Sequence, residues 1–440
     1  MPEAERESRI GAALAVYRDS RLLSVVVLGI ASGLPAPLLA VNVSIWLRDA
    51  GLGRAAVAAF GAVAAPYAVN FLWAPVFDRV PPPFGAARLG QRRGWLLLLL
   101  LALAAAILAL AVQDPLNGLS RMAAAAVATA IVSASLDVVV DAYRIEVLDA
   151  PRMGAGSAAA ILGWHLGGTV LGGAGGLLLA ARFGWPAAYA ALAAALCVPL
   201  LALFAMREPT VPPRRRSAAH GWRARLAEAV VEPLRLLAAR PLWGEILAFI
   251  VLFKLGDAML GRMSGVFYRE MGFDYATIAE VSKIYGIGAT LAGGLAGGAL
   301  LRAIGLGRGL FLAGVLMAAT NLLFAGLAAD PGRPWFVAAV VGDGLTSGFG
   351  VVAFVAFLSR LCDSGHAATQ YALLASIGNL ARILMAGSAG WMVDRLDGDW
   401  GRFFGSTALL AVPGLMILAH MLRSSRIGDG VFSRTNRTTS

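Results

Sequence analysis

Charged residues are scarce in this 440-residue chain, at 14% of the composition, whereas 59% of the residues are hydrophobic. A soluble globular domain would contain about 25% charged and about 45–50% apolar residues. Cysteine is scarce as well: only Cys197 and Cys362 occur, both in or beside apolar segments. The composition therefore excludes an ordinary soluble protein, and no disulfide framework is expected.

Motifs that carry chemistry are also missing. The sequence contains no zinc-type spacing, no His/Glu metal-binding helix, no Gly-x-Ser-x-Gly and no P-loop. We therefore expect no catalytic residues, no metal and no cofactor. The lack of a soluble output domain argues against a receptor. The first twenty residues are polar and charged, so no removable signal peptide is expected.

Long apolar runs are what the chain has instead, and runs of about 20 residues can cross a bilayer as helices. We predict an all-α polytopic membrane protein with twelve transmembrane helices. The predicted spans are 22–47, 55–77, 94–112, 120–146, 155–181, 185–206, 242–268, 276–301, 308–328, 334–361, 366–393 and 402–422. Pro35 and Pro37 are candidate kinks in the first span.

Basic residues are unequally distributed between the two sides of this topology. Of the 37 lysines and arginines, 25 fall on the side of the N-terminus, 8 on the other side and 4 within spans. The positive-inside rule then predicts that both termini are cytoplasmic. The net charge of +11 follows from this topology and from contact with anionic lipid, so the lipid bilayer is an expected partner and nucleic acid is not.

The spans divide six and six around an arginine-rich loop. The predicted parts are a cytoplasmic segment 1–21, a six-helix bundle 22–206, a basic linker 207–241, a second six-helix bundle 242–422 and a cytoplasmic tail 423–440. The halves look like repeats, because a basic loop follows the second span of each. This arrangement resembles the major facilitator superfamily, in which substrate binds near the midplane between the halves.

Two carboxylates lie inside the fourth predicted span. Asp137 and Asp141 are four residues apart and therefore share a helix face. Each charge at the bilayer centre costs about 2.5–3.5 kcal/mol on insertion scales. The two cannot both ionise cheaply and titrate as a unit, which favours a role in coupling transport to a proton gradient. Alternatively, Asp141 forms a structural pair with Arg144.

Further polar residues concentrate on spans 1, 4, 7 and 10, which line the cavity in the superfamily. Lys254 and Asp257 share a face and could neutralise each other. Lys283 and Arg382 could pair with carboxylates or meet an anionic substrate. The predicted substrate-binding residues are Asn42, Lys254, Asp257, Lys283, Asp343, Gln370, Tyr371, Asn379 and Arg382.

A second charged group lies at the cytoplasmic face, around the loop after the second span. It consists of Asp78, Arg79, Arg92 and Arg93. Because these residues are outside the predicted membrane core, we interpret them as a conformational latch and not as a substrate site.

Several motifs resemble the AmpG-type muropeptide permease family. They are VNFLWAPVFDR at 69–79, PPF at 82–84, RRGW at 92–95, SASLD at 133–137, DAYR at 141–144, FKLGD at 253–257 and ATQYALL at 368–374. The resemblance extends from about residue 25 to 420. It implies import of N-acetylglucosaminyl-anhydro-N-acetylmuramyl peptides across the bacterial inner membrane by proton symport, with Asp137, Asp141, Lys254 and Asp257 on polar motif positions.

The sequence also departs from that family's pattern. Leu136 stands where glutamine is common, Asp343 where a glutamate is usual, and Tyr143-Arg144 where some members have Trp-Lys. The leading hypothesis is a monomeric proton-coupled muropeptide importer of the inner membrane with a small-molecule substrate. The alternative is a permease of the same superfamily for a siderophore, an acyl-coenzyme A or a peptide.

Overall fold

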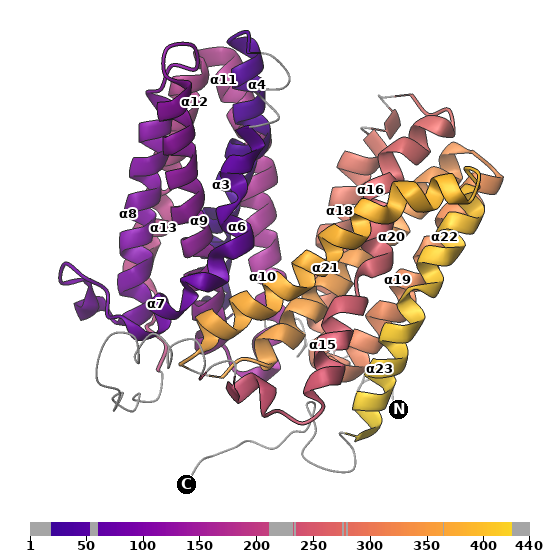
Figure 1. Cartoon of the computed structure of the whole chain (residues 1–440). Helices are drawn as coiled ribbons and strands as arrows, with labels where there is room; N and C mark the ends of the chain where they lie inside the picture. Colours follow the sequence, from indigo (N-terminus) through magenta and orange to yellow (C-terminus); the bar gives the residue numbers. More distant parts are fainter. Residues whose placement is uncertain are drawn as a thin grey trace. The chain divides into compact units, whose positions relative to one another are not determined.

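The computed structural model describes residues 19–52, 60–210, 232, 235–274, 277–278, 280–363 and 365–424. Secondary structure in these residues is helical (Figure 1). They divide into two compact units. The N-terminal unit comprises the described residues up to 232 together with the segment 362–373, and the C-terminal unit comprises 235–361 and 374–424.

The N-terminal unit contains six predicted spans. Its elements in order are α2 (Ser20–Gly33), α3 (Pro35–Pro37), η2 (Leu38–Asn42), α4 (Val43–Asp49), η3 (Gly61–Ala64), α6 (Pro66–Val69), η4 (Asn70–Leu72), α7 (Ala74–Arg79), η5 (Ala86–Leu89), α8 (Gln91–Ala111), α9 (Leu119–Val147), η6 (Ala150–Arg152), α10 (Met153–His165), η7 (Leu166–Gly175), α11 (Gly176–Phe183), α12 (Trp185–Ala195), α13 (Cys197–Ala202) and η8 (Leu203–Ala205).

The C-terminal unit contains the other six. Its elements are α15 (Trp243–Leu252), α16 (Leu255–Glu270), η9 (Glu280–Tyr285), α18 (Gly286–Ile304), α19 (Leu306–Ala329), α20 (Arg333–Arg360), α21 (Ala367–Arg395), α22 (Trp400–Leu409) and α23 (Ala411–Ser424). The first residues of α21 belong to the N-terminal unit. The prediction had placed them in the second bundle, 242–422. The bundle boundaries themselves stay a prediction.

Nine helical segments among the described residues are long and apolar enough to cross a membrane. They coincide with nine of the twelve predicted spans. The other three predicted spans are also largely helical where described. The second is a series of short helices, the seventh is divided into α15 and α16, and the eleventh is the single helix α21.

The first and the seventh span are interrupted for different reasons. In the first, Pro35 and Pro37 precede a π-helical turn, so the predicted kink site is where the regular helix breaks. In the seventh, the break falls at Phe253 and Lys254 without any proline, and Lys254 has non-helical backbone angles. A helix end inside a span leaves backbone polar groups free to meet other polar groups.

Glycine allows close helix packing between α2 and α10 with η7. A Cβ atom on Gly33 would lie 2.2 Å from the carbonyl oxygen of Trp164, and one on Gly167 would lie 2.0 Å from that of Ile30. The backbones of the two segments are therefore in direct contact, as small residues permit in membrane helices.

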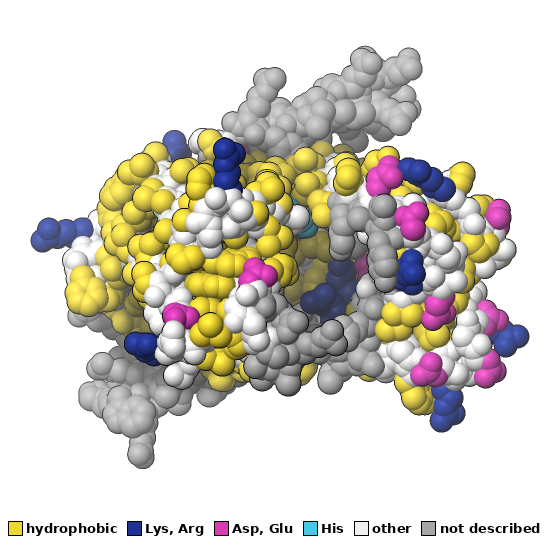
Figure 2. Space-filling model, turned by 90° about the horizontal axis from the view of Figure 1, so that it is seen from above, with side chains coloured by type: hydrophobic (Ala, Val, Ile, Leu, Met, Phe, Trp, Pro, Cys, Tyr) yellow, Lys and Arg dark blue, Asp and Glu magenta, His cyan; other side chains and the backbone are white. Residues whose placement is uncertain are grey.

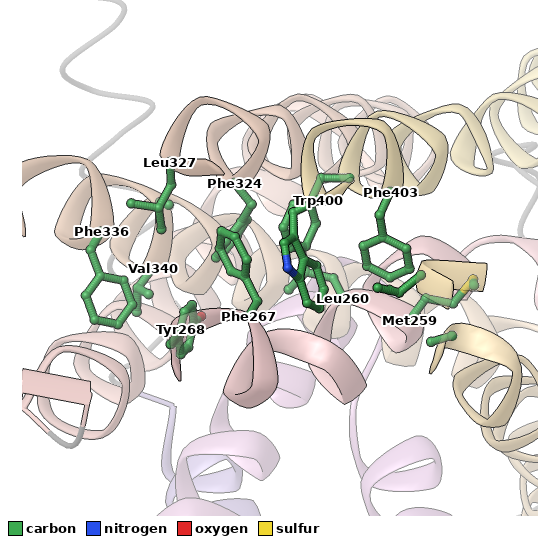
Figure 3. Packing of buried hydrophobic residues seen from close by; sticks show 14 of the residues in the cluster. Met259, Leu260, Phe267, Tyr268, Phe324, Leu327, Phe336, Val340, Trp400 and Phe403 are labelled. Atoms are coloured by element: carbon green, nitrogen blue, oxygen red, sulfur yellow. The ribbon is translucent and has the colours of Figure 1, made fainter. Parts of the chain in front are cut away.

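Aromatic side chains form a core in the C-terminal unit (Figure 3). Phe267 lies edge-on to Phe404, with 4.7 Å between ring centroids. The indole of Trp400 donates to Glu270 at 2.7 Å, which joins α22 to the end of α16. Hydrophobic side chains also make up much of the face that is seen from above in the space-filling view (Figure 2).

Candidate functional site

Asp137 lies on α9 in a polar cluster of the N-terminal unit. Its Oδ1 accepts a hydrogen bond of 2.6 Å from the hydroxyl of Ser32 on α2. The hydroxyls of Tyr67 and Ser133 are buried nearby and close enough to interact with each other, but neither makes a hydrogen bond of normal geometry among the described residues. Buried polar groups are normally satisfied. This cluster therefore has the capacity to bind a proton, a water molecule or a polar solute.

Asp141, one turn further along α9, has a different environment. Its carboxylate pairs with Arg144 at 2.9 Å, and the Arg144 side chain is fully buried. Arg144 also donates to Ser157 at 3.1 Å and stacks on the ring of Tyr371 at 5.3 Å. The structural pair left open by the sequence is thus present, while a role for Asp141 in proton coupling stays a prediction.

Arg92 is the centre of the charged group at the predicted cytoplasmic end. Its buried guanidinium pairs with Asp78 at 2.8 Å and with Glu146 at 2.6 Å. A second bond of 2.7 Å to Glu146 makes that contact bidentate, and the carbonyl of Phe77 accepts a further bond at 3.0 Å. Such charge-assisted pairs fix geometry strongly, so α7, α8 and α9 are held together here.

Asp78 also binds the start of α21, within the same unit. Its Oδ2 accepts hydrogen bonds from the backbone N–H and the hydroxyl of Thr369, at 2.9 and 2.7 Å. Its Oδ1 accepts a bond from the N–H of Ala368 at 3.3 Å. A carboxylate is stabilised at a helix N-terminus, where backbone N–H groups lack helical partners.

The other two latch residues contact the end of the sixth span and the segment that follows it. Arg93 donates to the carbonyl oxygens of Leu203 and Phe204, and Arg79 pairs with Glu232 at 2.6 Å. Glu208 accepts from the backbone N–H groups of Arg92 and Arg93, at 2.8 and 2.9 Å, and so caps α8. Asp78, Arg92 and Arg93 are therefore joined by direct contacts, and Arg79 forms a separate pair.

In the C-terminal unit, four charged side chains gather around the break in the seventh span. The Nζ of Lys254 lies 4.0 Å from Asp257, and Ser347 on α20 donates to Asp257 at 3.2 Å. Asp343 and Arg382 lie close enough to interact electrostatically with Lys254. Arg382 also donates to Asn379 at 2.8 Å. Two cations and two anions thus meet in a segment that is otherwise apolar.

Three other predicted substrate-binding residues lie elsewhere. Asn42 is fully buried and donates to the carbonyl of Gly172, so its carboxamide connects the first and fifth spans. Gln370 is fully buried and exchanges hydrogen bonds with Asp363, and Tyr371 lies against Arg144. Their direct contact with a substrate stays a prediction. The side chain of Lys283 is outside the part that the structure describes.

Sequence reasoning missed several residues of these networks, namely Ser32, Tyr67, Glu146, Ser157, Glu208, Glu232, Ser347 and Thr369. Glu146 could have been suspected, because a buried arginine needs a carboxylate and Glu146 follows Arg144 at the end of the fourth span. The serines and Thr369 carry no distinguishing pattern in the sequence.

The fold and these buried polar groups define a polytopic membrane transporter. The profile described as Major Facilitator Superfamily matches residues 21–386. The chain is 36% identical over 429 residues to the anhydromuropeptide permease of Escherichia coli K12, covering 96% of this chain and 84% of the relative. It is 30% identical to the putative transporter AmpG 4 of Rickettsia felis, covering 92% of this chain and 97% of the relative.

Solved structures agree on the fold. The human organic anion transporter MFSD10 superposes with a TM-score of 0.64 at 19% identity, covering 95% of this chain and all of that one. The proton:xylose symporter XylE superposes with a TM-score of 0.64 at 11% identity, covering 94% and 96%. The chain therefore belongs to the major facilitator superfamily and, within it, to the family of AmpG-type permeases. It is a multi-pass membrane permease and not an enzyme.

Proposed function

We propose that the chain imports muropeptides, N-acetylglucosaminyl-anhydro-N-acetylmuramyl peptides, by proton symport for recycling of the cell wall. The sequence identity to the Escherichia coli anhydromuropeptide permease over nearly the whole chain supports this solute class. The charged cluster around Lys254 supports a zwitterionic solute, because two cations suit carboxylates and two anions suit an amine.

Asp137 is the proposed proton carrier. The observation that supports it is the polar cluster of Ser32, Tyr67 and Ser133, which supplies hydroxyls. Among the described residues no cation acts on this carboxylate to hold it permanently charged. In this proposal Asp137 takes up a proton from the acidic exterior and releases it to the cytoplasm. The proton gradient is then the only energy source and no cofactor is required.

The network around Asp78 and Arg92 is the proposed latch of alternating access. In one state Asp78 holds the start of α21, and in the other these hydrogen bonds are released. Three hydrogen bonds join Asp78 to the first turn of α21. They support this role, because one small movement of α21 would break all three together.

The remaining parts of the proposal concern the setting. We place the permease in the bacterial inner membrane as a monomer, with both termini cytoplasmic and without a nucleic-acid partner. The excess of basic residues on the side of the N-terminus supports that orientation.

Uptake of radiolabelled anhydromuropeptide into proteoliposomes tests the solute directly, together with growth complementation of a strain that lacks its own muropeptide permease. Excess unlabelled muropeptide should abolish uptake, whereas a siderophore, an acyl-coenzyme A or an unrelated peptide should leave it unchanged. Uptake of one of those solutes, with none of the muropeptide, would assign the permease to the alternative substrate class.

A further inference from the structure

A groove with a volume of about 210 Å³ lies in the N-terminal unit between the start of α2 and the end of the sixth span. Leu23 and Val27 form one apolar wall, one turn apart on α2, and Ala202 and Ala205 belong to the opposite wall. Leu23 is 65% exposed. The apolar part of the groove is therefore open towards the surrounding lipid.

The other end of the groove is polar and carries positive charge. Arg21 and Arg207 lie there with the hydroxyl-bearing residues Ser20, Ser24 and Tyr143. Tyr143 donates to the carbonyl oxygen of Arg207 at 3.0 Å, which fixes the backbone of Arg207 at the rim. Arg207 itself is exposed.

The facing charges leave this end with a positive excess. Asp19 and Glu208 are acidic neighbours. The carboxylate of Asp19 already pairs with Arg21 at 2.8 Å and with Arg152 at 2.9 Å, and that of Glu208 accepts from the backbone N–H groups at the start of α8. Arg152 in turn also pairs with Asp149. With Arg93, which lies near Tyr143 as well, four arginines face three carboxylates, and Arg207 is the cation that forms none of these ion pairs.

We propose that this groove binds one anionic phospholipid of the adjacent leaflet. The phosphodiester lies at Arg207 and Arg21, within reach of the serine hydroxyls, and one acyl chain follows Leu23 and Val27 into the membrane. Charge complementarity and the apolar wall both point to a lipid, since a free phosphate would leave the wall unused. The predicted topology places the groove at the cytoplasmic leaflet. The inference is independent of which solute is carried.

The test is native mass spectrometry of the purified full-length protein with phosphatidylglycerol or phosphatidylcholine of identical acyl chains. Wild type should retain phosphatidylglycerol about fivefold more strongly, and Arg207→Gln should remove most of that preference, since one basic residue contributes about 1 kcal/mol, or a factor of about five. Ala205→Phe should reduce retention of both lipids by filling the groove. Arg302→Gln, which removes an exposed arginine of the C-terminal unit, should change neither.

Four results would overturn the proposal. The first three are equal retention of both lipids by wild type, equal losses in Arg207→Gln and Arg302→Gln, and full retention in Ala205→Phe. Displacement of the lipid by soluble glycerol 3-phosphate would show an anion site without a lipid role and would also overturn it. A lipid-free melting temperature equal to that of wild type verifies that each variant is folded.

Discussion

Thr369 donates both its backbone N–H and its hydroxyl to the carboxylate of Asp78, although the two residues are 291 positions apart in the sequence. The same carboxylate pairs with Arg92. A carboxylate with a buried cation on one side and a helix N-terminus on the other has few alternative partners. Asp78 is therefore bonded to α8 on one side and to the start of α21 on the other, as the proposed latch requires.

Release of this contact should be measurable at Cys362, which begins the segment 362–373. In a Cys197→Ser background, Asp78→Asn should increase the rate of maleimide labelling of Cys362 severalfold, because the neutral amide holds the start of α21 less tightly. Thr369→Val should give a smaller increase, since it removes one hydroxyl and keeps the N–H. Arg88→Gln, an exposed change in the same loop, is the control. Unchanged labelling in Asp78→Asn would contradict the latch.

Removal of Arg92 should destabilise the protein strongly. Arg92→Gln leaves Asp78 and Glu146 buried without their cation, and breaking a buried pair in this way costs about 3–5 kcal/mol. The melting temperature in detergent measures the effect. Arg92→Gln combined with Glu146→Gln should recover part of the loss, because one uncompensated carboxylate has then been removed. A double variant less stable than the single one would argue against the pairing.

Close packing of α2 against η7 gives a prediction with an internal control. Gly167→Ala should lower stability by about 1–3 kcal/mol, the usual range for overpacking, because its new methyl group meets the carbonyl of Ile30 at 2.0 Å. Gly288→Ala on α18 has open space and should be neutral or stabilising by up to about 1 kcal/mol through helix propensity. Similar melting temperatures for both variants would disprove the backbone contact.

The cap of α2 should be sensitive to acid. Arg21, which donates to the Asp19 carboxylate, holds the pKa of Asp19 below its ordinary value of 3.8. A depressed pKa means that the stabilisation is complete above pH 4 and is lost as the pH falls through the lower, folded-state pKa. Asp19→Asn keeps a capping side chain and removes the charge, so it should lower stability at neutral pH by about 0.2–1 kcal/mol, the usual contribution of an exposed ion pair, and by less in strong acid. A loss that does not depend on pH would contradict this explanation.

Contacts between residues close in the sequence could be predicted, and contacts between residues far apart in it could not. The Asp141–Arg144 pair follows from a spacing of three on one helix, and the kink in the first span follows from Pro35 and Pro37. The partners of Arg92 could not be assigned, because Glu146 is 54 positions away and several carboxylates were equally plausible.

Other contacts could not be predicted because the spans are apolar on all sides. Helices that are apolar all round give no periodicity that would identify the inward face, so Ser32 beside Asp137 could not be anticipated. The break at Lys254 carries neither proline nor glycine at the break itself, and tertiary packing decides it. Nothing in the sequence indicated that Asn42, predicted to bind substrate, donates to the carbonyl of Gly172 between the first and fifth spans.

Uptake of radiolabelled anhydromuropeptide into proteoliposomes under an imposed pH gradient tests whether Asp137 couples transport to protons. Wild type and Asp330→Asn, an exposed control, should take up more solute when the outside is acidic. Asp137→Asn should show at least about tenfold slower accumulation and no response to the gradient. Accumulation by Asp137→Asn that still follows the gradient would contradict the claim.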